Sequence, residues 1–208
     1  MRRCVIVGGA DIGRPETIRA ALRDDDYMIY CDCGLRHLPR LGRAADLIVG
    51  DFDSHENPHA QTETIVLPHE KDDTDTYFAA KEALRRGFRD FLLLGVVGAR
   101  LDHTLGNLGL LLMLDGAGAE AKILDDYSEI EIVSHRTATV SGGFPYFSLL
   151  NISGTARHVT VTGAKFPLED ASIPCDTSLG VSNEVLPGQT ARISVGEGRL
   201  LLVRIREE

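Results

Sequence analysis

The chain has 208 residues, of which 43% are hydrophobic and 25% are charged, and its formal net charge is −9. This balance is typical of a globular protein with one large domain or two small ones. No apolar stretch reaches the about 20 residues of a membrane-spanning helix, and no basic stripe suits nucleic acid. We therefore expect neither a membrane nor a nucleic-acid partner.

The amino-terminal segment and the cysteines bear on the cellular compartment. The apolar run Cys4–Val7 is too short for the core of a secretion signal. Cys31 and Cys33 have no second pair at zinc-binding spacing, and disulfides are rare in proteins that are not exported. We expect reduced thiols and a cytoplasmic protein.

The first half of the chain alternates strand-like and helix-like segments. Strands are predicted at Cys4–Val7, Tyr27–Cys31, Leu47–Val49, Thr64–Leu67, Phe91–Leu94 and Ala121–Leu124. Helices are predicted from near Pro15 to Leu22, over Gly34–Leu41, from Asp72 to Arg86 and over His103–Leu114. This alternation predicts an α/β domain with a mainly parallel sheet and helices on both faces.

The second half changes to short β-rich segments separated by Gly, Pro, Ser and Asn. They are Glu129–Val133, Arg136–Val140, Tyr146–Ile152, Arg157–Thr162, Thr190–Val195 and Arg199–Arg206. This spacing predicts an all-β sandwich or barrel, with no further helix required. We place an α/β domain at residues 1–126 and an all-β domain at 127–208.

An Asp-x-Asp pair, Asp51 and Asp53, follows the third predicted strand. Residues i and i+2 of a strand point to the same side, so these carboxylates repel each other unless a cation lies between them. Oxygen ligands suit Mg²⁺, which commonly joins one or two carboxylates to substrate phosphates. The alternative is a pair of acids that only solvate a loop.

Other acidic residues also follow predicted strands: Asp32, then Asp72 and Asp75, then Asp102. Ligands of open α/β sheets lie beyond the carboxyl ends of the strands, so we expect these carboxylates to converge there. Such a gathering is electrostatically costly without a cation, which favours the Mg²⁺ site. We expect Asp72 to cap the following helix, with Thr74 as the alternative, and Asp75 to be the better metal ligand.

The turn after the fifth strand contains Gly95, Gly98 and Arg100. Glycines let the backbone approach phosphates closely, although this turn matches neither of the common phosphate-binding motifs. Arg100 is either a phosphate ligand or an exposed surface residue. Lys71 is either a phosphate contact or a solvated loop lysine. His103 is either a phosphate contact or a residue packed at the start of a helix.

Ser182 and Asn183 follow Gly180 in the β-rich half. Small polar side chains at this place suit recognition of a heteroaromatic amine, and the alternative is an ordinary β-turn.

Four motifs occur in a characteristic order: Gly50-Asp51-Phe52-Asp53-Ser54, Lys71-Asp72-Asp73-Thr74-Asp75, Gly95-Val96-Val97-Gly98-Ala99-Arg100-Leu101-Asp102-His103 with Asn107, and Gly180-Val181-Ser182-Asn183-Glu184. Together they closely resemble the thiamine pyrophosphokinase family. The resemblance implies an α/β catalytic domain that binds ATP and Mg²⁺, and a β-sandwich that helps to bind thiamine. It also implies a homodimer with sites at the subunit interface, and the conversion of ATP and thiamine into AMP and thiamine diphosphate.

The resemblance also implies roles for individual residues. Asp51, Asp53 and Asp75 match the acids that handle metal and phosphate, while Arg100 and Asp102 match an active-site pair. Asp32, Lys71, Thr74, Gly98, Arg100 and His103 form the expected ATP-binding set. Ser182 and Asn183 match the thiamine contacts. The chain departs from the family pattern at Cys31-Asp32-Cys33-Gly34 and at Gly98-Ala99-Arg100, and it has no Trp, so an aromatic residue that stacks on thiamine must be Tyr or Phe.

Three other functions fit parts of this pattern. A Mg²⁺-dependent phosphatase also uses an Asp-x-Asp pair at a strand end, but there the first Asp usually follows the amino-terminal strand. A nucleotide- or thiamine-binding module without turnover is the non-enzymatic alternative, and the intact acids argue against it. A kinase for another hydroxylated heterocycle is the third.

Overall fold

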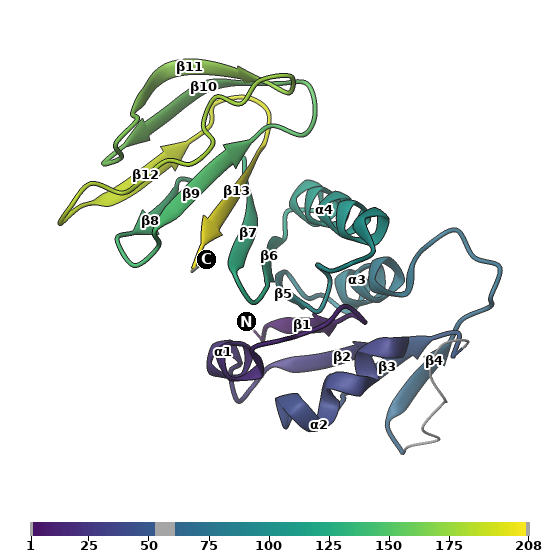
Figure 1. The fold of residues 1–208 in the computed structure, drawn as a ribbon. Coiled ribbons are helices and arrows are strands. Elements are labelled where there is room, and N and C mark those ends of the chain that lie inside the picture. The colour runs from purple at the N-terminus through teal and green to yellow at the C-terminus, as the bar shows by residue number, and fades with distance from the viewer. Residues whose placement is uncertain (1, 53–60, 207–208) are drawn as a thin grey trace. The chain divides into compact units, whose positions relative to one another are not determined.

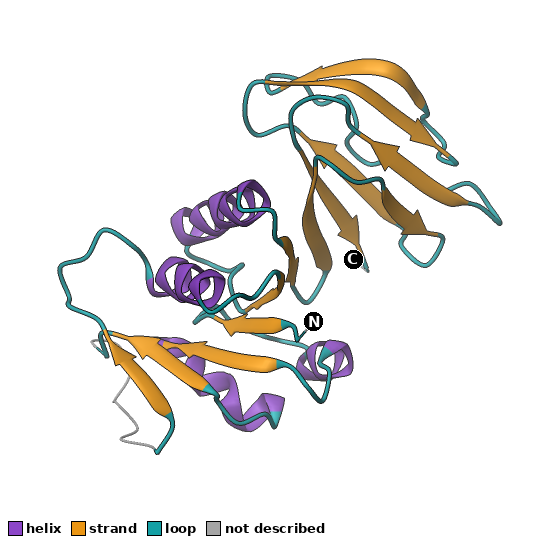
Figure 2. Ribbon diagram, turned by 180° about the vertical axis from the view of Figure 1, so that it is seen from behind, coloured by secondary structure: helices purple, strands orange, loops and turns teal. Residues whose placement is uncertain are grey.

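A computed structural model describes residues 2–52 and 61–206 of the chain. The protein divides into two compact units, Met1–Asp126 and Tyr127–Glu208, which are called the α/β unit and the β unit below. Among the described residues, helices occur only in the α/β unit (Figure 2). None of these helices is long and apolar enough to cross a membrane.

The sheet of the α/β unit is parallel in every strand pair that the structure describes, as the sequence predicted. Its strands are β1 (Cys4–Val7), β2 (Tyr27–Cys31), β3 (Leu47–Gly50), β4 (Glu63–Val66), β5 (Asp90–Leu94) and β6 (Glu120–Leu124). Their spatial order is β4-β3-β2-β1-β5-β6 (Figure 1). The order reverses between β1 and β5, and such a switch point opens a crevice at the carboxyl ends of the strands.

Helices cover both faces of this sheet (Figure 1). They are α1 (Pro15–Ala21), the 3₁₀ helix η1 (Asp32–His37), α2 (Leu38–Leu41), α3 (Asp75–Arg85) and α4 (Leu101–Gly116). One face packs Ile18, Leu35 and Leu41 of α1, η1 and α2 against β-strand side chains such as Val5 and Tyr30. On the other face α3 lies against β1, β2 and β3, and α4 lies against β6.

Two helix predictions need correction. The helix expected to begin at Gly34 begins at Asp32 as a 3₁₀ turn. The helix expected from Asp72 begins at Asp75, and its N-cap is Thr74, whose hydroxyl accepts a 3.3 Å hydrogen bond from the Tyr77 amide. Thr74 takes this role because its backbone is extended and its side chain reaches the third residue along. Asp72 is an exposed loop residue.

The β unit is a sandwich of two antiparallel sheets, which confirms the predicted fold. Its strands are β7 (Ser128–Val133), β8 (Ala138–Ser141), β9 (Tyr146–Leu150), β10 (Thr155–Thr162), β11 (Leu168–Pro174), β12 (Thr190–Ser194) and β13 (Leu200–Ile205). One sheet has the order β7-β13-β9 and the other β11-β10-β12-β8. Side chains from both, including Phe147 and Val161, form one apolar core. Strand β11 was not predicted.

Candidate active site

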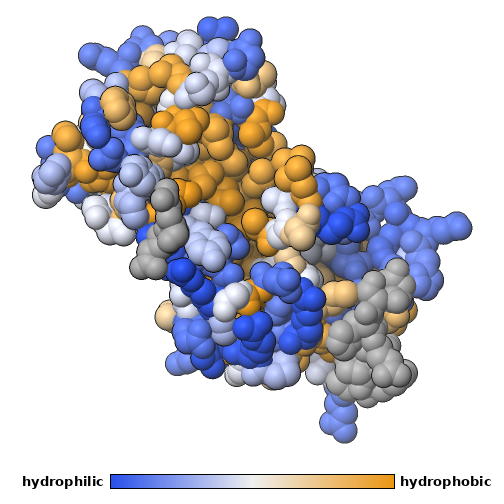
Figure 3. Space-filling view, in the orientation of Figure 1, coloured by the Kyte–Doolittle hydropathy of each residue, from blue (hydrophilic) through white to orange (hydrophobic). Residues whose placement is uncertain are grey.

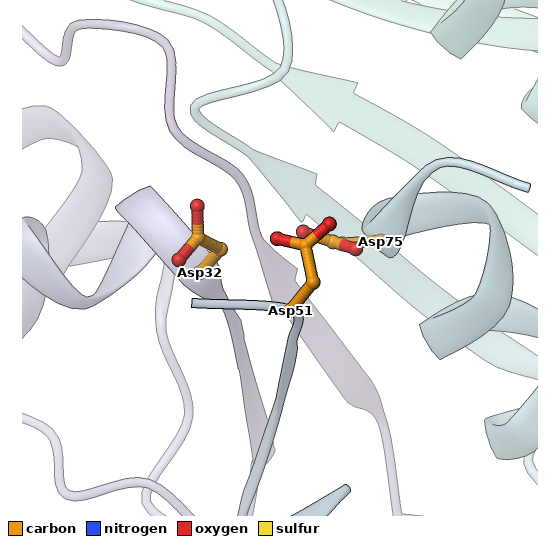
Figure 4. A group of neighbouring side chains, drawn as sticks. All are labelled: Asp32, Asp51 and Asp75. Atoms are coloured by element: carbon orange, nitrogen blue, oxygen red, sulfur yellow. The ribbon is translucent and has the colours of Figure 1, made fainter. Parts of the chain in front are cut away.

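Three carboxylates from separate parts of the α/β unit meet at one point. Asp32 opens η1 directly after β2, Asp51 follows β3, and Asp75 is the first residue of α3. One carboxylate oxygen from each residue lies within 4.8 Å of the others. The side chains of Asp51 and Asp75 lie beside each other, with Asp32 next to them (Figure 4). The parallel strands bring these acids together because their carboxyl ends share one edge of the sheet.

The backbone is bent sharply around this cluster. Asp32 has φ 32° and Phe52 has φ 56°, both in the left-handed region that L-residues seldom occupy. Gly34 makes the turn after β2 possible, because a Cβ atom there would lie 2.2 Å from the Val7 carbonyl oxygen. The turn that carries Asp32 therefore depends on a glycine two residues later.

The ammonium group of Lys71 lies between two of the carboxylates. Its Nζ donates a short hydrogen bond to the Asp51 carboxylate and lies 2.9 Å from Asp75 Oδ1. Partial burial lowers the pKa of Lys71, but hydrogen bonds and charge from Asp51 and Asp75 outweigh it and raise the pKa above its ordinary value. Lys71 is thus a charged partner of the cluster, and the carboxylates are arranged to hold a positive charge.

A second feature of the site is a cradle of glycines at the switch point. Gly8 follows β1, and Gly95 follows β5. A Cβ atom at Gly8 would lie 2.7 Å from the Gly95 carbonyl oxygen, and a Cβ atom at Gly95 would lie 2.6 Å from the Gly8 carbonyl oxygen. Gly95 has φ 60°, and a Cβ atom at Gly98 would lie 2.8 Å from the Ala10 Cβ. A side chain at any of these positions would collide with the opposite loop, so only glycine lets the two loops pack this closely beside the pocket.

The helix η1 fixes the loop that continues this cradle. Arg36 hydrogen-bonds to the Gly9 carbonyl and, at 2.8 Å, to Asp11 Oδ1. His37 is 2% exposed, and its Nε2 lies 2.8 Å from the Ala10 carbonyl. Burial lowers the pKa of His37, with the backbone hydrogen bond to Ala10 acting in the opposite direction. These contacts hold the loop after β1 in place.

The carboxylates and the cradle line one pocket of about 570 Å³. Of the predicted residues, it includes Asp32, Asp51, Lys71, Thr74, Asp75, Gly98, Arg100 and His103. The structure adds Thr76 and the buried Asn107, which are joined by a 3.1 Å hydrogen bond and were not predicted as site residues. Asn107 also donates to the Val96 carbonyl at 2.9 Å, so it ties α4 to the glycine turn. Asn107 lies four positions after His103, and apart from its place in the motif nothing in the sequence marks it as a site residue.

Arg100 and Asp102 form an exposed pair at the rim, and Asp102 lies apart from the three clustered acids. Arg100 donates two hydrogen bonds to the Asp102 carboxylate, at 2.9 and 2.6 Å. These bonds hold the pKa of Asp102 well below its usual range. The Asp102 carboxylate lines a neighbouring hollow with Asp72 and Lys81. Asp53, the other acid of the Asp-x-Asp pair, lies outside the described residues.

In the β unit, the predicted Ser182 and Asn183 differ in their surroundings. Asn183 is 3% exposed, and its side-chain oxygen accepts hydrogen bonds from the Phe166 and Glu184 amides at 3.0 and 2.9 Å. Its Nδ2 donates to the Phe166 carbonyl at 2.8 Å. Ser182 is exposed, has φ 56°, and its amide donates to Ser148 Oγ at 3.0 Å. Asn183 therefore braces the backbone of Phe166, whereas the Ser182 side chain faces solvent.

The segment beside Asn183 lines a pocket of about 320 Å³ with an apolar rim. The exposed fractions of its rim side chains are 57% for Phe166, 44% for Leu179 and 44% for Val181. Apolar residues are also prominent on the visible face of the β unit (Figure 3). Sequence reasoning did not identify Phe166, because only the folded chain places it next to Asn183.

Two family models match the chain. "Thiamin pyrophosphokinase, catalytic domain" matches residues 18–123, more than half of the chain, and "Thiamin pyrophosphokinase, vitamin B1 binding domain" matches residues 130–200. The chain belongs to the thiamin pyrophosphokinase family. Each model falls within one of the two compact units.

Individual thiamin pyrophosphokinases agree with this assignment. The enzyme of Bacillus subtilis is 28% identical over 163 residues, covering 74% of this chain and 76% of the relative. A solved structure from Geobacillus thermodenitrificans has a TM-score of 0.84 and 28% identity, covering 99% of this chain and 98% of its own. The yeast structure has a TM-score of 0.78 at 15% identity, covering 98% and 86%, and shows the common fold.

Proposed function

We propose that this protein transfers the pyrophosphoryl group of ATP to the hydroxyl of thiamine, giving thiamine diphosphate and AMP, with Mg²⁺ as the metal. The observation that carries the proposal is the convergence of Asp32, Asp51 and Asp75, with ligand oxygens within 4.8 Å, beside a glycine cradle in one pocket. This combination suits a divalent ion and a polyphosphate chain together.

The donor set fits Mg²⁺. All three side chains offer hard carboxylate oxygens, and the cluster already attracts the Lys71 ammonium group. Asp51 and Asp75 would hold the ion, Asp32 lies close enough to join them, and Asp53 is proposed as a further ligand from its motif. When bound, Mg²⁺ neutralises phosphate charge and orients the reacting phosphorus.

The polyphosphate is proposed to lie over the glycine cradle. Gly8, Gly95 and Gly98 line the pocket without side chains that could block a phosphate. Arg100 and His103 lie at its rim. Arg100 is always charged and suits bidentate phosphate binding once it exchanges Asp102 for phosphate oxygens. The helix start capped by Thr74 adds its positive dipole end near the cluster.

Thiamine recognition is proposed for the β unit. Ser182 supplies an exposed hydroxyl, and Phe166 supplies an exposed aromatic face for a heterocycle. Asn183 acts indirectly, since its amide is bound to the backbone of Phe166 and Glu184. Phe166 is then the phenylalanine that stacks on the substrate in a chain without Trp.

The reaction is an in-line displacement. The thiamine hydroxyl oxygen bonds to the β-phosphorus, the bond from that phosphorus to the oxygen bridging to the α-phosphorus breaks, and AMP leaves with that oxygen. A carboxylate, either Asp102 or a member of the cluster, accepts the hydroxyl proton. Catalysis of this kind depends mainly on positioning and charge neutralisation.

We further propose that the protein is a homodimer and that it is located in the cytoplasm. The cytoplasmic location suits the four free thiols.

The test is to incubate the pure protein with ATP, Mg²⁺ and thiamine and to quantify nucleotides and thiamine esters by chromatography. We expect AMP and thiamine diphosphate in equal amounts, and no products when Mg²⁺ is chelated. Release of ADP or inorganic phosphate without thiamine diphosphate would contradict the proposal.

A further inference from the structure

Lys71 occupies a position that a metal ion would also require. Its Nζ binds the Asp51 carboxylate and lies 2.9 Å from Asp75 Oδ1. The side chains are 17% exposed for Lys71, 10% for Asp51 and 19% for Asp75, so the three charges lie largely out of solvent. The lysine comes from the segment between β4 and α3, four residues before Asp75.

An ammonium group and a divalent ion compete for the same oxygens. Mg²⁺ requires its oxygen ligands at about 2.0–2.1 Å and repels a neighbouring positive charge. Lysine is a compact charge on a flexible four-carbon stem, so it can leave one pair of oxygens for another nearby. The same pocket contains the glycine cradle, where phosphate oxygens would provide such acceptors.

We propose that Lys71 is an exchangeable counter-ion of this site, an inference that rests on the proposed binding of Mg²⁺ and ATP. Without ligands Lys71 offsets part of the negative charge of Asp51 and Asp75. When Mg²⁺ takes these carboxylates, the ammonium group is released and binds the phosphate oxygens of the nucleotide. Lys71 thereby couples metal binding to nucleotide binding, because the displaced charge has a partner only when the polyphosphate is present.

This role differs from two simpler ones in a measurable way. If Lys71 only stabilised the fold, its removal would lower stability and leave Mg²⁺ binding unchanged or weaker. If it only bound phosphate, its removal would not affect Mg²⁺ binding in the absence of nucleotide. An exchangeable counter-ion competes with the metal, so its removal tightens Mg²⁺ binding to the nucleotide-free protein while weakening nucleotide binding.

The first experiment compares Lys71→Gln and Lys71→Met with wild type. Mg²⁺ binding without nucleotide is measured by calorimetry, and binding of an α,β-methylene analogue of ATP is measured in saturating Mg²⁺. We expect about tenfold tighter Mg²⁺ binding and about tenfold weaker analogue binding in both variants. The matched control is Lys81→Gln, which removes a lysine that pairs with Asp73 on the exposed surface. Unchanged or weaker Mg²⁺ binding by folded Lys71 variants overturns the proposal.

A second experiment uses the unaltered protein and so does not depend on folding of the variants. Lysine acetylation rates are measured by mass spectrometry, with Lys81 as the internal reference. Mg²⁺ alone should increase the acetylation rate of Lys71 several-fold, and Mg²⁺ with the ATP analogue should lower it again. No acceleration by Mg²⁺ in a protein that does form thiamine diphosphate overturns the exchange alone, whereas absence of thiamine diphosphate from wild type overturns the proposed function.

Discussion

The two candidate sites use their polar motif residues in opposite ways. In the α/β unit the carboxylates of Asp51 and Asp75 converge on the ammonium group of Lys71 and line a pocket. In the β unit the amide of Asn183 is buried and bound to the backbone of Phe166 and Glu184. Residues of a sequence motif can therefore differ in role: Asp51 and Asp75 point their carboxylates into a pocket, whereas Asn183 holds the backbone beside one.

The largest expected effect tests the α/β side of this comparison. Replacing Asp75 with Asn removes one charge from the cluster, and we expect the rate of thiamine diphosphate formation to fall by about two orders of magnitude. Asp73→Asn is the control, since Asp73 pairs with the exposed Lys81 at 2.8 Å and lies outside the cluster. The rate of thiamine diphosphate formation is measured for both variants in steady-state assays. Equal rates would show that Asp75 is not a metal ligand.

The glycine cradle gives the next largest effect. Gly95 and Gly118 both have positive φ, 60° and 71°, but only Gly95 has backbone within contact of an added Cβ, at 2.6 Å from the Gly8 oxygen. Gly118→Ala should lower the free energy of unfolding by about 1 kcal/mol from backbone conformation alone. Gly95→Ala should lower it by about 2–3 kcal/mol and also weaken ATP binding.

Chemical denaturation and ATP titration of the two variants measure these losses. Equal losses of stability, with ATP binding intact in both, would show that the close approach at Gly95 has no role in the pocket.

Two substitutions in the β unit test whether Asn183 and Ser182 have different roles. Asn183→Ala removes three partly buried hydrogen bonds to the backbone and should destabilise the protein by about 2–3 kcal/mol while raising KM for thiamine. Ser182→Ala should raise KM for thiamine with stability within about 0.5 kcal/mol of wild type, because Ser182 is exposed. Thermal unfolding and steady-state kinetics separate the two, and a stable Asn183→Ala variant would refute the bracing role.

The smallest effect concerns pH. Burial lowers the pKa of His37 below its ordinary value of 6.5, so folding disfavours the protonated form of this residue. As pH falls below 6.5 the unfolded chain takes up the proton first, and stability declines until the pH passes the lower folded pKa. His37→Gln should flatten this part of the stability profile, whereas replacement of the exposed His135 should not. An identical pH profile for His37→Gln and wild type would contradict this account.

The sequence predicted the parts of this molecule that follow from local pattern. Asp32, Asp51 and Asp75 each come after a predicted strand. Because the carboxyl ends of parallel strands lie at one edge of the sheet, the sequence predicted that these acids lie together there. Strand β11 was missed because only Ile173 is fully buried there and its pairing with β10 shifts register, so no alternation is visible. The helix cap was assigned to Asp72 because several adjacent residues have capping side chains, and only the backbone at Thr74 decides among them.

The sequence did not predict which side chains of the sites contact one another. Lys71 was visible as a charged residue, but its position between Asp51 and Asp75 depends on the folded path of the loop after β4. Asp102 follows a strand as the clustered acids do, yet Arg100 two residues earlier holds it at the rim. Phe166 and Asn183 are distant in sequence and meet only through the sandwich.

The binding of the metal by Asp51 and Asp75 is tested by anomalous diffraction from crystals grown with Mn²⁺, in place of Mg²⁺, and the α,β-methylene analogue of ATP. We predict a metal peak within coordinating distance of Asp51 and Asp75, with analogue phosphate oxygens completing its shell and Lys71 turned towards the phosphates. A fully bound analogue whose metal ion lies away from both carboxylates would contradict the account.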